Sequence, residues 1–233
     1  MRKIDKHIEK LEFVKVYITD NGEQILTHFE GVIFNQNEDF IYMCDLSDFN
    51  YDGFVIVRKT DVAEIKRSDN EKFFNRILKE EKIIRNIRLR KREIGFRVGE
   101  MEEMFAQLRK KNFPVIVECL YGSEDSFQIG PIVQVKENKM KMDYFNSLGE
   151  FDEQPVSIKY KDITFVRIDS PYANLFYKYA TRPGEEVEKK KSKSKKKKSE
   201  KGVPKKDKKK SKKDKKSNKK SSKKKSKKLM MVV

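Results

Sequence analysis

The sequence predicts a mainly β protein with flanking helices, built as two small β-barrels in tandem that are joined by a helical linker and followed by a disordered, lysine-rich tail. Three observations predict this fold class: an internal repeat, segments in which apolar and polar residues alternate, and an abrupt change of composition near Arg182. The expected units are a first barrel with its N-terminal helix at 1–78, the linker at 79–99, a second barrel with its helix at 100–181, and the tail at 182–233.

The internal repeat is clearest in two stretches, DGFVIVRKTDVAEIKRSD at 52–69 and EQPVSIKYKDITFVRIDS at 153–170. Upstream of them, GVIFNQNEDFIYM begins at Gly31 and GPIVQVKENKMKM begins at Gly130. The offset between matching residues stays near 100 along the whole unit, which indicates an ancient tandem duplication.

Each repeat combines one amphipathic helix with several short strands. Ile4, Ile8 and Leu11 in the first repeat, and Met104, Phe105 and Leu108 in the second, are spaced as on one face of a helix. Residues such as Val14, Val16 and Ile18, and then Val55 and Val57, follow the period of two that is typical of strands. The segments NQNED at 35–39 and YDG at 51–53 predict turns. About five strands in so short a unit suit a small, strongly bent barrel, which closes its own edges.

The linker predicts one long helix, because apolar residues from Phe73 to Ile94 recur at helical spacing. Its opposite face is basic and carries the linker candidates for nucleic-acid binding, Lys82, Arg85, Arg88 and Arg92. Such a face binds a phosphate backbone, packs on the acidic barrels of the same chain, or is the solvated side of a structural helix.

The tail holds most of the positive charge. Residues 189–228 contain 25 lysines and three acids, a net charge of +22 within a total of +18, so the rest of the chain is mildly acidic at about −4. A flexible run of lysines binds phosphates through counterion release and without sequence preference. The candidate contacts of the tail are Lys195, Lys196, Lys197, Lys198, Lys208, Lys209, Lys210, Lys223, Lys224 and Lys225.

Several classes of function find no support in the sequence. It contains none of the metal, phosphate-loop or nucleophile motifs that mark enzymes, so a protein that is not an enzyme, with no metal and no cofactor, is expected. Cys44 and Cys119 are expected to be free thiols. No signal peptide or membrane-spanning run is recognised, and a cytoplasmic protein with no membrane partner is expected.

The segments GFVIVRKTDVAEI and GVIFNQNEDFIYM resemble the two motifs of the Sm and Sm-like family, to which the bacterial RNA chaperone Hfq belongs. Other SH3-like barrels share much of this pattern. The resemblance implies that Arg58 occupies the place of the RNA-contacting arginine, with Lys159 in the matching place of the second repeat. The glycine that follows in the Sm pattern is replaced by Lys59 and Tyr160, and Thr60 stands where Hfq has histidine. The candidate barrel contacts are therefore Arg58, Lys59, Lys159 and Tyr160.

The function expected from these observations is that of a non-enzymatic RNA-binding or ribosome-associated protein, in which the tail supplies electrostatic affinity and the barrels supply a scaffold. Two alternatives stay open. The barrels serve as protein-interaction or self-assembly modules that form a homo-oligomer through their edges, or the chain compacts DNA as a nucleoid protein.

Overall fold

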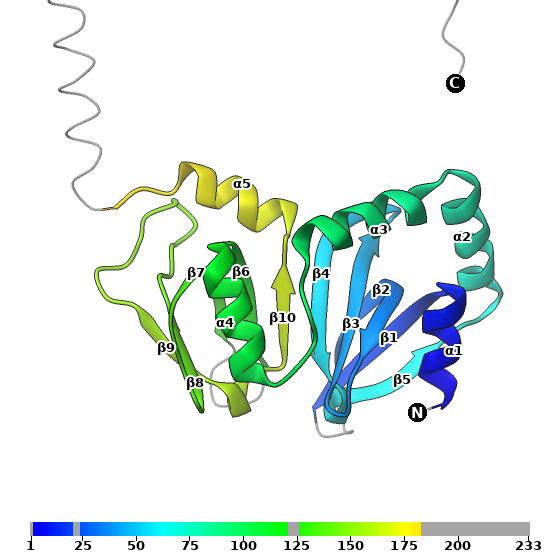
Figure 1. Cartoon of the computed structure of the whole chain (residues 1–233), viewed down its shortest axis with the longest axis horizontal. Helices are drawn as coiled ribbons and strands as arrows, with labels where there is room; N and C mark the ends of the chain where they lie inside the picture. The colour runs from blue at the N-terminus through cyan, green and yellow to red at the C-terminus, as the bar shows by residue number, and fades with distance from the viewer. Residues whose placement is uncertain (1, 21–23, 121–125, 183–233) are drawn as a thin grey trace, which may run out of the picture. The chain divides into compact units, whose positions relative to one another are not determined.

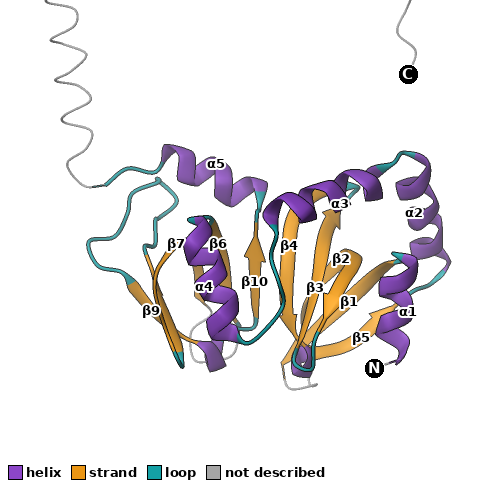
Figure 2. Ribbon diagram, in the orientation of Figure 1, coloured by secondary structure: helices purple, strands orange, loops and turns teal. Residues whose placement is uncertain are grey.

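A single antiparallel sheet of ten strands organises the computed structural model, which describes residues 2–20, 24–120 and 126–182 (Figures 1 and 2). These residues belong to the first of two units in the chain, Met1–Lys190, and the predicted tail after Arg182 lies outside the described residues. Along the sheet the strands follow the order β5-β1-β2-β3-β4-β10-β6-β7-β8-β9. The described part of the chain contains five α-helices and two short 3₁₀ turns in addition to the strands.

The first repeat forms five neighbouring strands of the sheet, preceded by one helix and followed by two. Its elements are α1 (Arg2–Lys10), β1 (Phe13–Asp20), β2 (Gln24–Gln36), β3 (Phe40–Ser47), β4 (Asn50–Arg58), η1 (Lys59–Asp61), β5 (Val62–Lys66), α2 (Asp69–Glu80) and α3 (Ile83–Ile94).

The second repeat forms the other five strands in the equivalent order. Its elements are α4 (Met101–Lys111), β6 (Pro114–Cys119), β7 (Ser126–Lys136), β8 (Lys139–Met142), β9 (Val156–Lys159), η2 (Tyr160–Asp162), β10 (Phe165–Ile168) and α5 (Pro171–Tyr179). The repeat extends to single positions. A Cβ atom at Gly31 would overlap the carbonyl oxygen of Cys44 in β3, and one at Gly130 would overlap that of Asp143, just after β8. The two halves of the sheet are thus built alike, as the internal repeat indicates.

The prediction of two small closed barrels joined by a helical linker is wrong. Each half is an open set of five strands, and β4 pairs with β10 in the register Phe165↔Val57 to Ile168↔Phe54, which makes one continuous sheet. The physical reason lies in the sequences FVIV (54–57) and FVRI (165–168), two apolar edges that each need a covering strand. We call this junction the seam.

The predicted linker helix is also different in the structure. It is divided into α2 and α3 because Lys82 adopts a left-handed backbone conformation with φ 59°. Helix α3 is not a spacer, since it buries Ile84, Ile87 and Ile94 in the core and crosses over the strands of the first half (Figure 1). The predicted turn YDG is likewise wrong: these residues are part of β4, and the chain turns at Asp48 and Phe49, both with positive φ.

The core crosses the seam on both faces of the sheet. On one face, Phe54 and Ile56 of β4 belong to the same buried cluster as Val166 and Ile168 of β10, together with residues of α3 and α4. On the other face, Phe165 of β10 packs with residues of the first half, and its ring meets that of Phe29 edge to face at 4.8 Å. Cys44 and Cys119 are buried and neither is part of a disulfide, as expected.

Polar side chains reinforce the seam at its partly buried positions. Arg167 Nη1 donates to Asp45 Oδ2 at 2.6 Å and to Asp52 Oδ2 at 2.7 Å, and both aspartates belong to the first half. Gly53 leaves space for the approach of the two backbones, because a Cβ at this position, where φ is +107°, would lie 2.8 Å from the carbonyl oxygen of Ile168. The two halves are therefore held by charge pairing as well as by apolar burial.

Replacement of Arg167 by leucine tests this polar tie. Burial raises the pKa of Asp45, and the Arg167 guanidinium opposes that rise. Without the arginine, Asp45 remains a buried, uncompensated carboxylate, so Arg167→Leu is expected to lower the free energy of unfolding by about 3–5 kcal/mol at neutral pH. When the pKa of a carboxyl group is raised by folding, its buried charge lowers stability above that pKa, and protonation removes this cost below it. The difference in unfolding free energy between Arg167→Leu and the wild type should therefore shrink as the pH falls toward 5.

Urea unfolding at pH 7 and pH 5 measures both effects. The control is Arg76→Leu at an exposed position of α2, where Arg76 and Glu80 are 3.9 Å apart and both well exposed. The control should lose no more than about 0.5 kcal/mol of unfolding free energy. An Arg167→Leu deficit that equals the control, or that does not change with pH, contradicts the role given to Arg167.

Candidate nucleic-acid interface

A cavity of about 520 Å³ opens beside the seam, and we call it the junction cavity. It brings together three of the four residues predicted as barrel contacts, Arg58 from β4 and Lys159 and Tyr160 from the end of β9 and the start of η2. Residues about 100 positions apart meet here because β4 pairs with β10, which follows η2 directly. The remaining residues that line the cavity are Met101, Glu137, Asn138, Lys139 and Lys161.

Positive charge dominates the junction cavity. Its cations are Arg58, Lys139, Lys159 and Lys161, and Glu137 is the one acid among the lining residues. None of these four cations takes part in the ion pairs found within the described part of the chain. Lys159 and Lys161 are exposed, so their ammonium groups are accessible to a ligand from solvent.

Arg58 is held in place by the second half of the protein. Its Nη2 donates to the backbone oxygen of Tyr160 at 2.8 Å, and its guanidinium lies 5.7 Å from the centre of the Phe40 ring. Part of its hydrogen-bonding capacity is therefore used in the fold. A guanidinium has five N–H donors, so further donors are left for an anion.

The side chains of Tyr160 and Lys59 make contacts within the fold, with Tyr160 buried and Lys59 half-buried. Tyr160 is 8% exposed, its hydroxyl donates to the Lys136 carbonyl at 2.6 Å, and its ring stacks on Phe105 at 5.2 Å, so burial raises its pKa to about 12. Lys59 does not line the cavity, and its ammonium group donates to the carbonyl oxygen of Asn37. The aromatic ring that would stack on a base is thus covered by the protein itself.

A second cavity, of about 440 Å³, lies where α3 ends, and we call it the α3 cavity. It contains two of the predicted linker candidates, Arg88 and Arg92, whereas Lys82 and Arg85 are exposed and line neither cavity. The other lining residues are Phe34, Lys91, Gly95, Phe96 and Arg97.

Lys91 and Arg97 are not among the linker candidates predicted from the sequence, although Lys91 lies beside the predicted basic face. Lys91 lies three residues after Arg88 and next to Arg92, and this spacing places the three side chains on neighbouring positions of a helix surface. That signal was available in the sequence. Arg97 follows the helix, and only the path of the chain after Gly95 brings it to the cavity.

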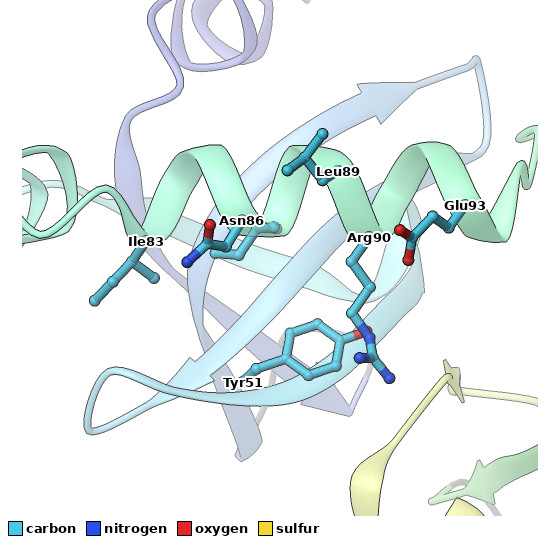
Figure 3. Close-up of a pocket in the computed structure, with 7 residues that line it drawn as sticks. Tyr51, Ile83, Asn86, Leu89, Arg90 and Glu93 are labelled. Atoms are coloured by element: carbon cyan, nitrogen blue, oxygen red, sulfur yellow. The ribbon is translucent and has the colours of Figure 1, made fainter.

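Arg90 serves the fold, although it lies on the same helix. Its Nη2 donates to Asp169 Oδ1 at 2.9 Å and its Nε to Asp169 Oδ2, while its guanidinium lies 4.7 Å from the Tyr51 ring centre. Figure 3 shows Arg90 directed toward Tyr51, in a mainly apolar cavity of about 420 Å³ that also holds Ile83 and Leu89. The charge of Arg90 is therefore neutralised by the second half of the protein.

Other kinds of site find little support in the described ranges 2–20, 24–120 and 126–182. No group of three or more histidine, cysteine, aspartate or glutamate residues there is arranged to hold a metal ion. No helix in these ranges has the length and apolar character needed to cross a membrane. The ten lysines predicted as tail contacts lie outside the described residues.

No family model, no curated protein and no solved structure matches this chain.

Proposed function

We propose that the protein is a non-enzymatic, cytoplasmic RNA-binding protein that associates with RNA or the ribosome. The observation that carries this proposal is the junction cavity, which gathers Arg58, Lys139, Lys159 and Lys161 without a carboxylate partner among the described residues. Composition alone does not produce such a group, because residues 1–182 carry slightly more acids than cations. A concave surface with several unpaired cations concentrates anions at that place.

The chemistry of the cavity favours phosphate contacts over base contacts. Phosphate oxygens accept hydrogen bonds from arginine and lysine and fix a nucleic acid in place without reading its sequence. Base stacking needs an exposed aromatic face, and the Tyr160 ring in this cavity is covered by Phe105. The folded unit is thus suited to hold a strand by its backbone, while the lysine-rich tail adds affinity that depends on salt.

A salt series with a single-stranded RNA tests the two contributions separately. The proteins are the full chain and a chain that ends at Arg182, with folding of the shorter chain checked by circular dichroism. The cavity variant is Lys139→Gln/Lys159→Gln/Lys161→Gln. The matched control is Lys6→Gln/Lys79→Gln/Lys110→Gln, which removes three exposed lysines that line neither cavity.

The full chain should bind RNA with affinity that falls steeply as salt increases, and the shorter chain should bind more weakly but measurably. Each lost phosphate contact lowers the slope of log K against log salt by about 0.7 for a single strand, so the cavity variant should lose about 2 from its slope. The control should keep its slope. Binding that vanishes with the tail, or equal losses in the two variants, rules out the cavity as a contact, and stronger binding to DNA favours the nucleoid alternative.

A second candidate function is self-assembly through strand edges. The seam is itself a pairing of two edge strands, β4 and β10, and it leaves β5 and β9 at the two ends of the sheet. By the order of the repeats, β5 is the equivalent of β10 and β9 is the equivalent of β4. A second copy could therefore add its β5 to β9 in the manner of the seam, and each copy would extend the sheet.

Light scattering over a range of protein concentrations measures this directly. Assembly predicts a mass that rises from one chain to two or more, and Ser157→Pro in β9 should reduce it, because proline removes a ladder hydrogen bond. A mass of one chain at every concentration contradicts assembly.

A further inference from the structure

The α3 cavity has a composition that the RNA-binding proposal does not use. Its lining contains four cations, Arg88, Lys91, Arg92 and Arg97, and no acid. A fifth cation lies beside it, because the Nζ atom of Lys111 is 3.8 Å from the place that a Cβ would take on Gly95. Five positive side chains from α3, from the segment after it and from α4 therefore surround one small hollow.

The backbone of Arg97 and the side chain of Lys91 are held by neighbouring residues. The amide side chain of Gln107 holds the backbone of Arg97, with its Oε1 accepting from the Arg97 N–H and its Nε2 donating to the Arg97 carbonyl, both at 3.0 Å. The Nζ atom of Lys91 lies 5.3 Å from the centre of the Phe34 ring. Cations that are ordered before a ligand arrives lose less entropy when they bind it.

The fold itself does not neutralise this charge. The C-terminal end of a helix carries roughly half of an elementary negative charge, which balances only a fraction of five cations. Among the described residues, the ion pairs involve other cations, such as Arg90 with Asp169. Burial lowers the pKa of Lys91, and the charge of Arg88 lowers it further, as is typical of a group that lacks an anionic partner.

The α3 cavity is suited to bind phosphate groups, but it offers no surface for a base. Its two aromatic residues, Phe34 and Phe96, are 8% and 7% exposed, so neither offers a face on which a base stacks. A volume of about 440 Å³ falls in the range of small-molecule sites and exceeds the volume that one phosphate group fills. A compact group with three or four negative charges matches the size and the charge of the hollow.

We propose that the α3 cavity binds the triphosphate group of a phosphorylated ligand, held by Arg88, Lys91, Arg92 and Arg97. The same chemistry is found at the 5′ end of an unprocessed RNA and in a free nucleoside triphosphate. An RNA 5′ end as the source of the triphosphate rests on the proposed RNA-binding function. Triphosphate binding by the α3 cavity does not depend on that function.

Calorimetric titration of the full-length protein with inorganic triphosphate tests the site. The site variant is Arg88→Gln/Arg92→Gln. The matched control is Lys82→Gln/Arg85→Gln, which removes the same charge from exposed positions of the same helix region that line no part of the α3 cavity. Both variants retain the lysine-rich tail, so weak binding to the tail is common to them.

The wild type and the control should show one saturable site per chain, and the site variant should bind at least about ten-fold more weakly, since the loss of even one charge-assisted hydrogen bond lowers affinity by about that factor. Equal losses in the two variants, or binding without a saturable site, would overturn the proposal. Thermal melting of the three proteins without ligand shows whether Arg88→Gln/Arg92→Gln is folded; if it is not, Arg97→Gln alone takes its place with the same expected direction.

Binding measurements with three ligands identify the source of the triphosphate. The ligands are ATP and one RNA sequence prepared with either a 5′-triphosphate or a 5′-hydroxyl. Preference for the triphosphate RNA that disappears in Arg88→Gln/Arg92→Gln supports the RNA end. Equal binding of the two RNAs, with ATP bound as tightly as inorganic triphosphate, supports the free nucleotide. Triphosphate binding without any RNA binding leaves the site standing and refutes the proposed RNA function. Failure of both ATP and triphosphate RNA to bind overturns the site.

Discussion

The pairing of β4 with β10 is the interaction on which the other features of this protein depend. Four residue pairs from Phe54↔Ile168 to Val57↔Phe165 join two repeats into one sheet, and the core then continues across both of its faces. The seam needs Gly53, because a side chain there would meet the backbone of β10. It also needs Arg167, which brings its charge to two aspartates of the other half. Two apolar edges that would be exposed in separate units are thus buried against each other.

The candidate sites follow from this constraint. Arg58 ends β4, and Tyr160 begins the short turn η2 before β10, so the seam places the two residues within hydrogen-bonding distance and creates the junction cavity. Helix α3 is fixed by the same contact between the halves, because Arg90 reaches Asp169 just after β10. With α3 held in this way, Arg88, Lys91 and Arg92 gather at its end beside Arg97.

Much of the local structure could be predicted from the sequence. The segments with a period of two form strands in the structure. Ile4 and Ile8 lie in α1, and Met104, Phe105 and Leu108 lie in α4, as their helical spacing predicts. The two repeats form two halves of the sheet with the same strand order. The barrels could not be rejected from the sequence, because FVIV at 54–57 shows that an edge needs cover but not which strand provides it. The break between α2 and α3 at Lys82 could not be predicted either, because no glycine or proline indicates the positive φ of this lysine.

Some of the candidate site residues could be predicted from the sequence, and others are revealed only by the tertiary structure. Arg58 and Lys159 were found from the repeat and do line one cavity, but the repeat alone does not reveal that Phe105 covers the Tyr160 ring or that Lys59 is tied to Asn37. Arg97 belongs to the α3 cavity only through the path that the chain takes after the helix ends, which is a property of the tertiary structure.

Hydrogen exchange of the backbone amides measures the seam most directly. If β4 and β10 are paired, all the amides of 54–57 and 165–168 should exchange only on global unfolding, as slowly as those of the interior strand β3. The outward-facing amides of the edge strands β5 and β9 should exchange much faster. If the amides of β4 and β10 that face each other exchange as rapidly as those at the edge of β9, the halves are separate, and the central claim of one continuous sheet is contradicted.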